Sequence, residues 1–351
     1  MERKPLITVL MPCFNAEEFL KEALESILNQ SYKNLEILCV NDGSTDKTGE
    51  ILEDYAQKDS RIKVIHNKTN LKLIHSLNNG IELAQGVYIA RMVSDDIALS
   101  NRIEKQLEYL IANPDIDIVS TGYYIINEKG DVIGKNIPRQ HSTLANFFAS
   151  FFFVPIGHPE LLIKTNVLKR NHFLQEDYAI HTEDYELWSR LLRDGKKFGN
   201  IDDCLHCFRI NSQSVSRKYT SIQDENFIQC ARLHYLEYSQ KDIPIEVLSI
   251  LVNRINKTLI LPDLKMALKG MREFKTLFIK KENIVDNIII KEINIVYNTH
   301  LFDICFQSIK KATLGIKVFS IWVLFLNMNM FFDKEVLRYL RQKINLKLNT
   351  N

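Results

Sequence analysis

Short apolar runs alternate with helix-periodic segments over the first 121 residues of the chain. The runs predict buried strands at 6–11, 35–40, 62–65, 87–92 and 116–121. Between the runs, apolar residues recur three and four positions apart and predict helices, two of them capped by Asn15 and by Ser100. The repeated strand–helix order favours a mostly parallel α/β sheet with helices on both faces.

The pattern becomes less regular after residue 121. It predicts a hairpin around Glu128-Lys129-Gly130, a strand at 161–163, a helix at 182–193 and a strand at 204–210. From about residue 220 onward the pattern is helical, with few turn signals. The sequence therefore predicts a sheet-based domain over 1–219, with halves at 1–121 and 122–219, and a helical region over 220–351.

A mostly apolar segment at 313–332 reaches ~20 residues, the length that spans a bilayer. Lys317, Asn327 and Asn329 interrupt it, and a central lysine costs ~3 kcal/mol on insertion scales. Basic residues dominate the tail that follows, namely Lys334, Arg338, Arg341, Lys343 and Lys347. Three interpretations stay open: a buried helix, a basic amphipathic helix on an anionic membrane surface, and a true span.

The composition is that of an ordinary globular protein, with 46% hydrophobic and 25% charged residues in 351. A net charge of +2 creates no strong field for nucleic acid, so we expect no nucleic-acid partner. Only Cys204 and Cys207 have a metal-like spacing, and no second pair completes a zinc set. The first residues lack a signal-peptide core. We therefore expect a cytoplasmic protein, peripheral at the inner face of the plasma membrane if the 313–332 helix binds lipid.

Polar side chains follow three of the predicted strands: Asn15 and Glu17, then Asp42, then Asp95 and Asp96. The carboxyl ends of parallel strands meet in one crevice, where ligands bind. Adjacent carboxylates repel each other unless a cation lies between them, and a hard divalent cation that carries a phosphate suits them. The first strand–helix junction has neither a GxGxxG nor a GxxxxGK loop, which disfavours a dinucleotide or P-loop site. An ordinary turn at Asp42 and helix capping by the acidic pair remain alternatives.

Several short motifs then occur in one order along the chain: Pro12-Cys13-Phe14-Asn15, Gln30-Ser31-Tyr32, Val40 to Asp46, Ala84-Gln85-Gly86 through Asp95-Asp96, Arg102 to Gln106, His158-Pro159 and Glu183 to Trp188. In this order and spacing the chain resembles a family 2 glycosyltransferase of the GT-A type, a group of inverting nucleotide-sugar transferases. The resemblance covers residues 5 to about 216. It implies a Rossmann-like GT-A sheet over those residues and nothing about the chain beyond about 220.

The resemblance also implies roles for individual residues. Asp42 would read the uracil of a UDP-sugar, in a pocket that begins with Pro12, Phe14, Asn15 and Glu17. The ribose and the Mn²⁺ or Mg²⁺ on the diphosphate would be bound by Asp95 and Asp96, with Arg209 near that diphosphate. The general base would be Asp184, and the acceptor side would include His158, Glu183 and Trp188. In the first turn of a helix, Glu183 and Asp184 would also suit the helix dipole without any catalytic role.

Three positions depart from the family pattern. Relatives often have an Asp where this chain has Val93, a Tyr where it has Phe14, and a His where it has Asn211. The metal role then rests on Asp95 and Asp96, and which of the two is the direct ligand stays undecided.

The resemblance and the residues together predict a metal-dependent, inverting hexosyl- or N-acetylhexosaminyl-transferase. It would move a sugar from a nucleotide donor, with a UDP-sugar expected, to a hydroxyl of a glycan or lipid-linked glycan in bacterial surface polysaccharide synthesis. Such a transfer needs one carboxylate base and a cation for the leaving diphosphate. The alternatives are a sugar nucleotidylyltransferase, whose glycine-rich first loop is missing here, and a catalytically silent homologue that binds a glycan or a partner protein.

Overall fold

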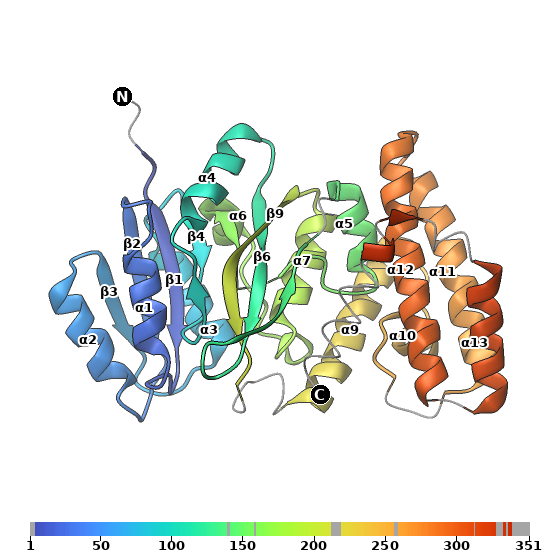
Figure 1. Ribbon diagram of the computed structural model, residues 1–351, viewed down its shortest axis with the longest axis horizontal. Coiled ribbons are helices and arrows are strands. Elements are labelled where there is room, and N and C mark those ends of the chain that lie inside the picture. Colours follow the sequence, from blue (N-terminus) through green and yellow to red (C-terminus); the bar gives the residue numbers. More distant parts are fainter. Residues whose placement is uncertain are drawn as a thin grey trace.

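The computed structural model describes residues 4–138, 141–157, 159–211, 219–255, 259–311, 313–327, 333–334 and 336–338. Its strands are β1 (Ile7–Cys13), β2 (Leu35–Asn41), β3 (Ile62–His66), β4 (Tyr88–Arg91), β5 (Ile97–Ala98), β6 (Ile118–Ile126), β7 (Val132–Asn136), β8 (Leu162–Lys164) and β9 (Phe198–Arg209). Its helices are α1 (Leu20–Leu28), α2 (Thr48–Lys58), α3 (Leu73–Leu83), α4 (Arg102–Ala112), α5 (Thr143–Ser150), α6 (Thr165–Arg170), α7 (Glu183–Arg193), α9 (Thr220–Ser239), α10 (Ile245–Leu251), α11 (Leu261–Lys281), α12 (Asn287–Lys311) and α13 (Leu314–Leu326). Figure 1 shows the sheet with its helices at one end of the molecule and α10–α13 at the other.

The strands form one sheet in the order β3-β2-β1-β4-β8-β6-β9-β5, with β7 paired to β6. The first four strands in this order are parallel, as predicted. Beyond them, β8 runs antiparallel to both β4 and β6, and β5 runs antiparallel to β9. The α/β class is confirmed, but the second half of the sheet is mixed, because only the first half has the strand–helix repeat that gives parallel pairs.

Burial explains why the strands in the first half of the sheet could be predicted from the sequence. Nearly every residue of β1 and all of β2 are buried, which is typical of parallel strands covered on both faces. The predicted helix caps are wrong. Asn15 has a left-handed backbone (φ 48°) ahead of α1, and α4 follows Asn101 without a side-chain cap. Both helices are held instead by their apolar faces, for example Leu20, Ala23, Leu24 and Ile27 of α1.

Helix α5 joins the sheet to the helices that follow residue 220 (Figure 1). Its Phe147 ring lies 5.3 Å from Tyr238 and 5.4 Å from Phe278, and Phe148 lies 5.3 Å from Phe278. One hydrophobic cluster therefore runs from β1 and β6 through α5 into α9, α11 and α12. The helical C-terminal region is confirmed, and it packs directly on the sheet-based part.

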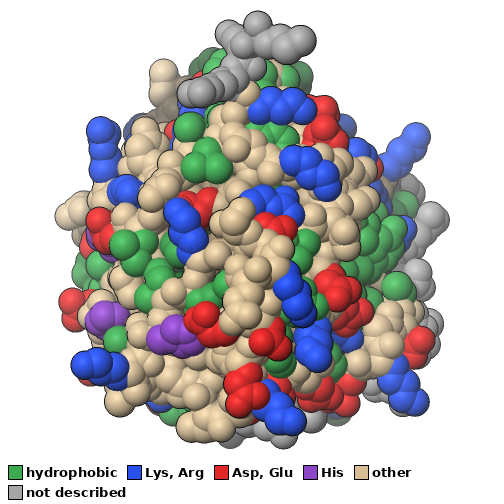
Figure 2. Space-filling model, turned by 90° about the vertical axis from the view of Figure 1, so that its left-hand side faces the viewer, with side chains coloured by type: hydrophobic (Ala, Val, Ile, Leu, Met, Phe, Trp, Pro, Cys, Tyr) green, Lys and Arg blue, Asp and Glu red, His purple; other side chains and the backbone are tan. Residues whose placement is uncertain are grey.

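The surface charge is mixed where it can be seen. Figure 2 shows the end of the molecule on the left of Figure 1, where basic and acidic side chains are interspersed. This distribution agrees with the net charge of +2 and gives that face no single-sign field.

Helix α13 is 13 residues long and lies within the apolar segment singled out in the sequence. Among the described residues, none of the helices combines the length and the apolar character needed to cross a bilayer. Helix α13 is buried on one face only. Its other face is exposed and carries Leu314, Val318, Ile321, Trp322 and Phe325. Residues 328–332 and the basic residues Arg341, Lys343 and Lys347 lie outside the described residues.

Gly86 tests the packing between β1 and the start of β4. Its backbone N–H donates to Thr8 Oγ1 (2.9 Å), and an added Cβ would lie 2.4 Å from the Thr8 nitrogen. We expect Gly86→Ala to lower the free energy of unfolding by ~1–3 kcal/mol, because backbone would have to move. Gly270 in α11 has nothing within 4 Å of an added Cβ, so Gly270→Ala should raise stability by ~0.5–1 kcal/mol. Urea unfolding of both variants checks this, and equal effects would contradict the packing.

Candidate functional site

The loops that follow β1 and β2 are tied together by side chains. Asn15 Oδ1 accepts from the Thr45 N–H (2.9 Å), and Glu17 Oε2 accepts from the Lys47 N–H (2.9 Å). The Phe14 side chain, in the first of these loops, is 47% exposed, and Pro12 at the end of β1 is half-buried. In this structure Asn15 and Glu17 hold the two loops, and Phe14 offers an apolar ring at the edge of the crevice.

Asp42 is buried at the end of β2. Its Oδ1 accepts from the Leu71 N–H (2.8 Å) and from Asn67 Nδ2 (2.8 Å). The turn expected here is present, since Gly43 has a φ of 67° and an added Cβ would lie 2.5 Å from Thr69. The turn role and a ligand role are compatible, because the turn fixes the carboxylate at the strand end.

The two carboxylates after β4 have different environments. Asp96 is 1% exposed, its Oδ1 accepts from the Arg209 N–H (2.8 Å), and its Oδ2 lies 2.9 Å from His206 Nε2. Asp95 is half-buried, and its Oδ2 accepts from Asn211 Nδ2 (2.8 Å). Burial, with the charge of Asp96 as a second cause, raises the pKa of Asp95 to about 7. Asp95 is thus the more accessible carboxylate of the pair, and Asp96 is part of the interior.

A buried chain of polar groups supports Asp96. His206 Nδ1 lies 3.2 Å from Arg102 Nη1. Arginine only donates, so Nδ1 must accept and the proton must lie on Nε2, which donates to Asp96. Burial lowers the pKa of His206, which keeps the imidazole neutral and fits this tautomer. The chain links α4 and β9 to the loop that carries both aspartates.

Arg209 is tied to the same loop. Its Nε donates to the Asp95 carbonyl (2.8 Å), its Nη1 donates to the carbonyls of Asn127 and Glu128, and its Nη2 pairs with Glu22. The side chain is buried. The guanidinium is therefore engaged by protein groups, and its expected position near a diphosphate stays a prediction.

The carboxylates of α7 approach the same region. Burial raises the pKa of Glu183 to about 7, with the Asp184 charge as a second cause, and burial also raises the pKa of Asp184. The buried Arg91 guanidinium interacts electrostatically with Glu183 and with Asp96. One buried cation therefore interacts with a member of each acidic pair, Glu183 of one and Asp96 of the other.

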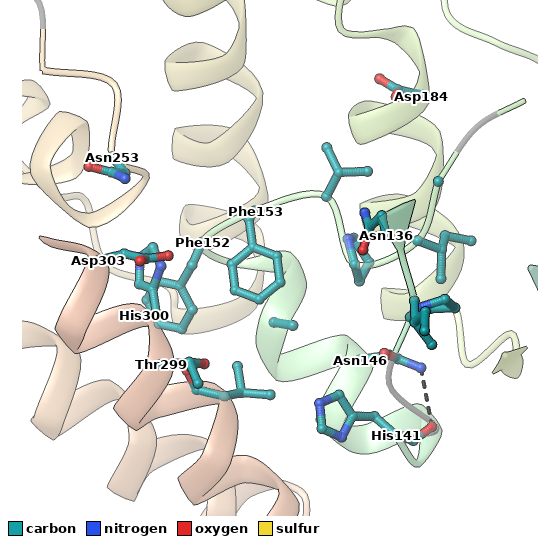
Figure 3. A pocket seen from close by; sticks show the side chains of 18 of the residues that line it. Asn136, His141, Asn146, Phe152, Phe153, Asp184, Asn253, Thr299, His300 and Asp303 are labelled. Atoms are coloured by element: carbon teal, nitrogen blue, oxygen red, sulfur yellow. Dashed lines mark hydrogen bonds between the residues drawn. The ribbon is translucent and has the colours of Figure 1, made fainter. Parts of the chain in front are cut away.

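A cavity of about 680 Å³ lies beside Asp184. Figure 3 shows Asp184 and Asn136 on one side of it, α12 with Thr299, His300 and Asp303 on the other, and Phe152 and Phe153 between them. Its described lining does not include Asp42 or Asp95. The volume is typical of a site for a small molecule.

Two residues expected on the acceptor side, Trp188 and His158, are not found beside the cavity among the described residues. Trp188 is fully buried, with its ring 6.3 Å from both Phe173 and Phe198, so its indole belongs to the core and the expectation of an acceptor contact is wrong. It points inward because it lies on the apolar face of α7. His158 lies outside the described residues.

Sequence reasoning missed Glu160, which lines the cavity. It is fully buried, and its Oε1 accepts from Ser120 Oγ (3.1 Å). Burial raises its pKa to about 8, so the carboxyl keeps its proton at neutral pH. A charged residue directly before the apolar run 161–163 was the signal that could have found it.

The described side chains alone do not supply a complete set of ligands for a metal ion. Among the described residues, no group of three or more His, Cys, Asp or Glu side chains could hold an ion. Mg²⁺ often takes only one or two carboxylates and fills its other positions with substrate phosphate and water. A single accessible carboxylate, Asp95, fits that pattern.

Comparison with known proteins agrees with this geometry. The model of glycosyl transferase family 2 matches residues 8–220. An uncharacterized glycosyltransferase of Haemophilus influenzae is 37% identical over 71% of this chain and 79% of its own length. The O-antigen biosynthesis glycosyltransferase WbnJ of Escherichia coli is 29% identical over 70% of this chain and 94% of its own.

Solved structures share the fold at low sequence identity. Staphylococcus aureus TarS 1–349 in complex with UDP-GlcNAc has a TM-score of 0.55 at 16% identity, over 85% of this chain and 91% of that one. The mannosyltransferase PcManGT of Pyrobaculum calidifontis, in complex with GDP-Man and Mn²⁺, has a TM-score of 0.52 at 15% identity, over 99% of this chain and 87% of that one. These matches confirm the GT-A sheet followed by helices.

Removal of the Asp96 carboxylate tests the buried hydrogen bonds that join Asp96 to His206 and Arg209. Asp96→Ala would leave the His206 Nε2–H and the Arg209 N–H without an acceptor in the interior. We expect a loss of ~3–5 kcal/mol in the free energy of unfolding. Asp203 pairs with Lys105 on the surface, so Asp203→Asn should change stability by less than ~1 kcal/mol. Urea unfolding compares the two, and a similar small loss in both would show that Asp96 is not a structural anchor.

The raised pKa of Glu160 predicts a pH dependence of stability. Between pH 4.5 and about 8 the folded chain holds a proton that the unfolded chain has released. The free energy of unfolding therefore falls as pH rises through that range. Glu160→Gln cannot titrate, so its stability relative to wild type should increase from the lower end of the range to the upper. Unfolding curves of both proteins at the two ends measure this, and a constant difference would refute the assigned protonation.

Proposed function

This chain belongs to glycosyl transferase family 2, and on that premise we propose that it transfers one sugar, with inversion, from a nucleotide-sugar donor to a hydroxyl of a glycan or lipid-linked glycan. One observation carries the proposal. Asp184 lies on the wall of the cavity, and the buried Arg91 guanidinium interacts electrostatically with both its neighbour Glu183 and Asp96. The base would thus line the cavity, and the loop for the diphosphate would lie next to it, outside the described lining.

Asp184 is the proposed general base. It would take the proton from the acceptor hydroxyl while that oxygen bonds to the anomeric carbon and the bond from this carbon to the diphosphate oxygen breaks. Burial raises the pKa of Asp184, which makes its carboxylate a stronger base at neutral pH. The Tyr185 N–H donates to Asp184 Oδ1 (2.7 Å) and orients the group.

Asp95 is the proposed metal ligand, and Asp96 would position it. Only Asp95 of the pair is accessible, whereas Asp96 is engaged by His206 and Arg209. A bound Mn²⁺ or Mg²⁺ would stabilise the negative charge of the leaving diphosphate. The Arg209 guanidinium would act through the Asp95 carbonyl, to which it donates.

A UDP-sugar is the proposed donor. The anchored Asp42 carboxylate could accept from the N–H of uracil, with Phe14 beside the base. The structural neighbour that holds UDP-GlcNAc supports this choice. The neighbour that holds GDP-Man makes guanosine donors the alternative to be tested beside it.

Helix α13 is proposed to rest on an anionic membrane surface, as a lipid-linked acceptor in polysaccharide synthesis would require. Val318, Ile321 and Trp322 are each more than half exposed on one face. Lys317 lies within α13, and Lys334 and Arg338 are basic residues of the tail that follows it. An apolar face beside basic residues is typical of helices that lie in the interface of anionic bilayers. The O-antigen relative supports a setting in surface polysaccharide synthesis.

The base is tested with Asp184→Asn, beside Asp203→Asn as the surface control. Release of nucleoside diphosphate from UDP-glucose, UDP-GlcNAc and GDP-mannose with Mn²⁺ measures turnover, and calorimetry with UDP measures binding. We expect Asp184→Asn to lower turnover ~10²–10⁴-fold with unchanged UDP affinity. Normal turnover would rule out Asp184 as the base. A wild-type protein that binds UDP but turns over none of these donors would favour the catalytically silent homologue.

Membrane contact is tested by co-sedimentation with vesicles of phosphatidylglycerol and phosphatidylcholine. Trp322→Glu should weaken binding, because it puts a charge at the centre of the exposed face. Val285→Glu, at an exposed position between α11 and α12, is the control and should bind like wild type. Equal binding of all three proteins, or equal binding to purely zwitterionic vesicles, would contradict the proposal.

A further inference from the structure

The cavity beside Asp184 is built partly by residues beyond the family match, which ends at residue 220. Its far wall comes from the α10–α11 loop, through Val252, Asn253 and Arg254, and from α12, through Thr299 and Asp303. Figure 3 shows this wall opposite Asp184. The helical region is thus a part of the site and not only a support for it.

This wall is firmly attached to the sheet-based part. The Ser142 N–H at the start of α5 donates to Glu292 Oε2 of α12 (2.8 Å). The His300 ring lies tilted against Phe152 (centroids 5.0 Å apart) and Phe153 (5.6 Å), and its Nε2 contacts the Leu251 carbonyl. The wall therefore has a fixed position relative to the cavity floor.

The helical region also reaches the base itself. Arg254 pairs with Asp224 (2.6 Å) and lies over the Phe227 ring (4.8 Å). Its charge lowers the pKa of Asp184 and so opposes the effect of burial. A ligand that contacts Asp184 would therefore lie close to Arg254.

The lining has the chemistry of a saccharide site. Phe153 is 37% exposed and offers an apolar ring for the face of a pyranose. Asn136, Asn253 and Asp303 supply hydrogen-bonding groups around it. Pockets that combine an apolar floor with a few polar groups fix the orientation of small ligands.

The charges of the lining favour a neutral ligand. Its basic side chains are Lys135 and Arg254, and its acidic ones are Asp184 and Asp303, while the Glu160 carboxyl keeps its proton at neutral pH. Arg254 already pairs with Asp224. The cavity therefore has no excess of positive charge for a phosphate-rich polymer.

We propose that residues 252–254, which follow α10, and the facing side of α12 form an acceptor subsite for a neutral sugar residue, with Asn253 and Asp303 as selectivity determinants. The subsite rests on the proposed function, since Asp184 on the opposite wall would activate the hydroxyl of that sugar. The donor nucleotide would lie elsewhere, because the described lining includes neither Asp42 nor Asp95.

Asparagine-to-glycine changes give a matched pair of variants. Asn253 and Asn283 both have left-handed backbones, with φ of 57° and 50°, and only Asn253 lines the cavity. Glycine adopts this conformation without strain, so both variants should fold. Asp303→Asn is the second variant at the subsite, since it keeps the size and removes the charge.

Saturation-transfer NMR with the methyl glycosides of glucose, galactose, mannose and N-acetylglucosamine measures binding without turnover. At least one should bind wild type, with affinity reduced about three- to tenfold by Asn253→Gly and at least tenfold by Asp303→Asn. Asn283→Gly should match wild type, and UDP affinity should be unchanged in all variants.

Three results would overturn the subsite: loss of UDP affinity together with glycoside affinity, tighter binding of ribitol 5-phosphate than of the neutral glycosides, or no glycoside binding by a wild-type protein that hydrolyses nucleotide sugars. The last result would leave the proposed transferase standing. Glycoside binding that depends on Asn253, in a protein with no nucleotide-sugar turnover, would instead support the subsite and refute the transferase.

Discussion

The buried hydrogen bonds of Asp96 are the constraint on which the rest of the site depends. Asp96 accepts from His206 and from the Arg209 backbone, and His206 in turn accepts from Arg102. These groups come from a loop after β4, from α4 and from β9, so the chain of bonds joins the two halves of the sheet. A buried polar group that loses its partner is costly, which favours this arrangement of the loop. That arrangement leaves Asp95 as the accessible carboxylate.

A second constraint comes from α5 and the helices that pack on it. The Phe147 and Phe151 rings pack with Tyr238, Phe274 and Phe278 in a single aromatic cluster. Because this cluster is shared, the positions of α9 and α11 are coupled to the sheet-based part through packing and not through a flexible linker. Residues of the C-terminal helical region line the cavity together with Asp184 of the sheet-based part.

Features that leave a pattern in neighbouring residues could be predicted from the sequence. The buried runs of β1, β2 and β4 and the acidic residues at strand ends were predicted, since periodicity and adjacency are visible in the chain itself. The antiparallel insertion of β8 and the burial of Arg209 depend on contacts between distant segments, for which a single sequence has no signal. Trp188 shows the limit of a motif, because its position was expected in the site and its side chain faces the core.

The most direct test of the account is a crystal structure of the protein with UDP and Mn²⁺. We predict that the ion lies ~2.1 Å from an Asp95 carboxylate oxygen, with the diphosphate as its other ligand and Asp96 still bonded to His206. We also predict the uracil at Asp42 and the cavity beside Asp184 open for an acceptor. An ion bound by Asp96 after its release from His206, or a nucleotide seated in the cavity beside Asp184, would contradict the account.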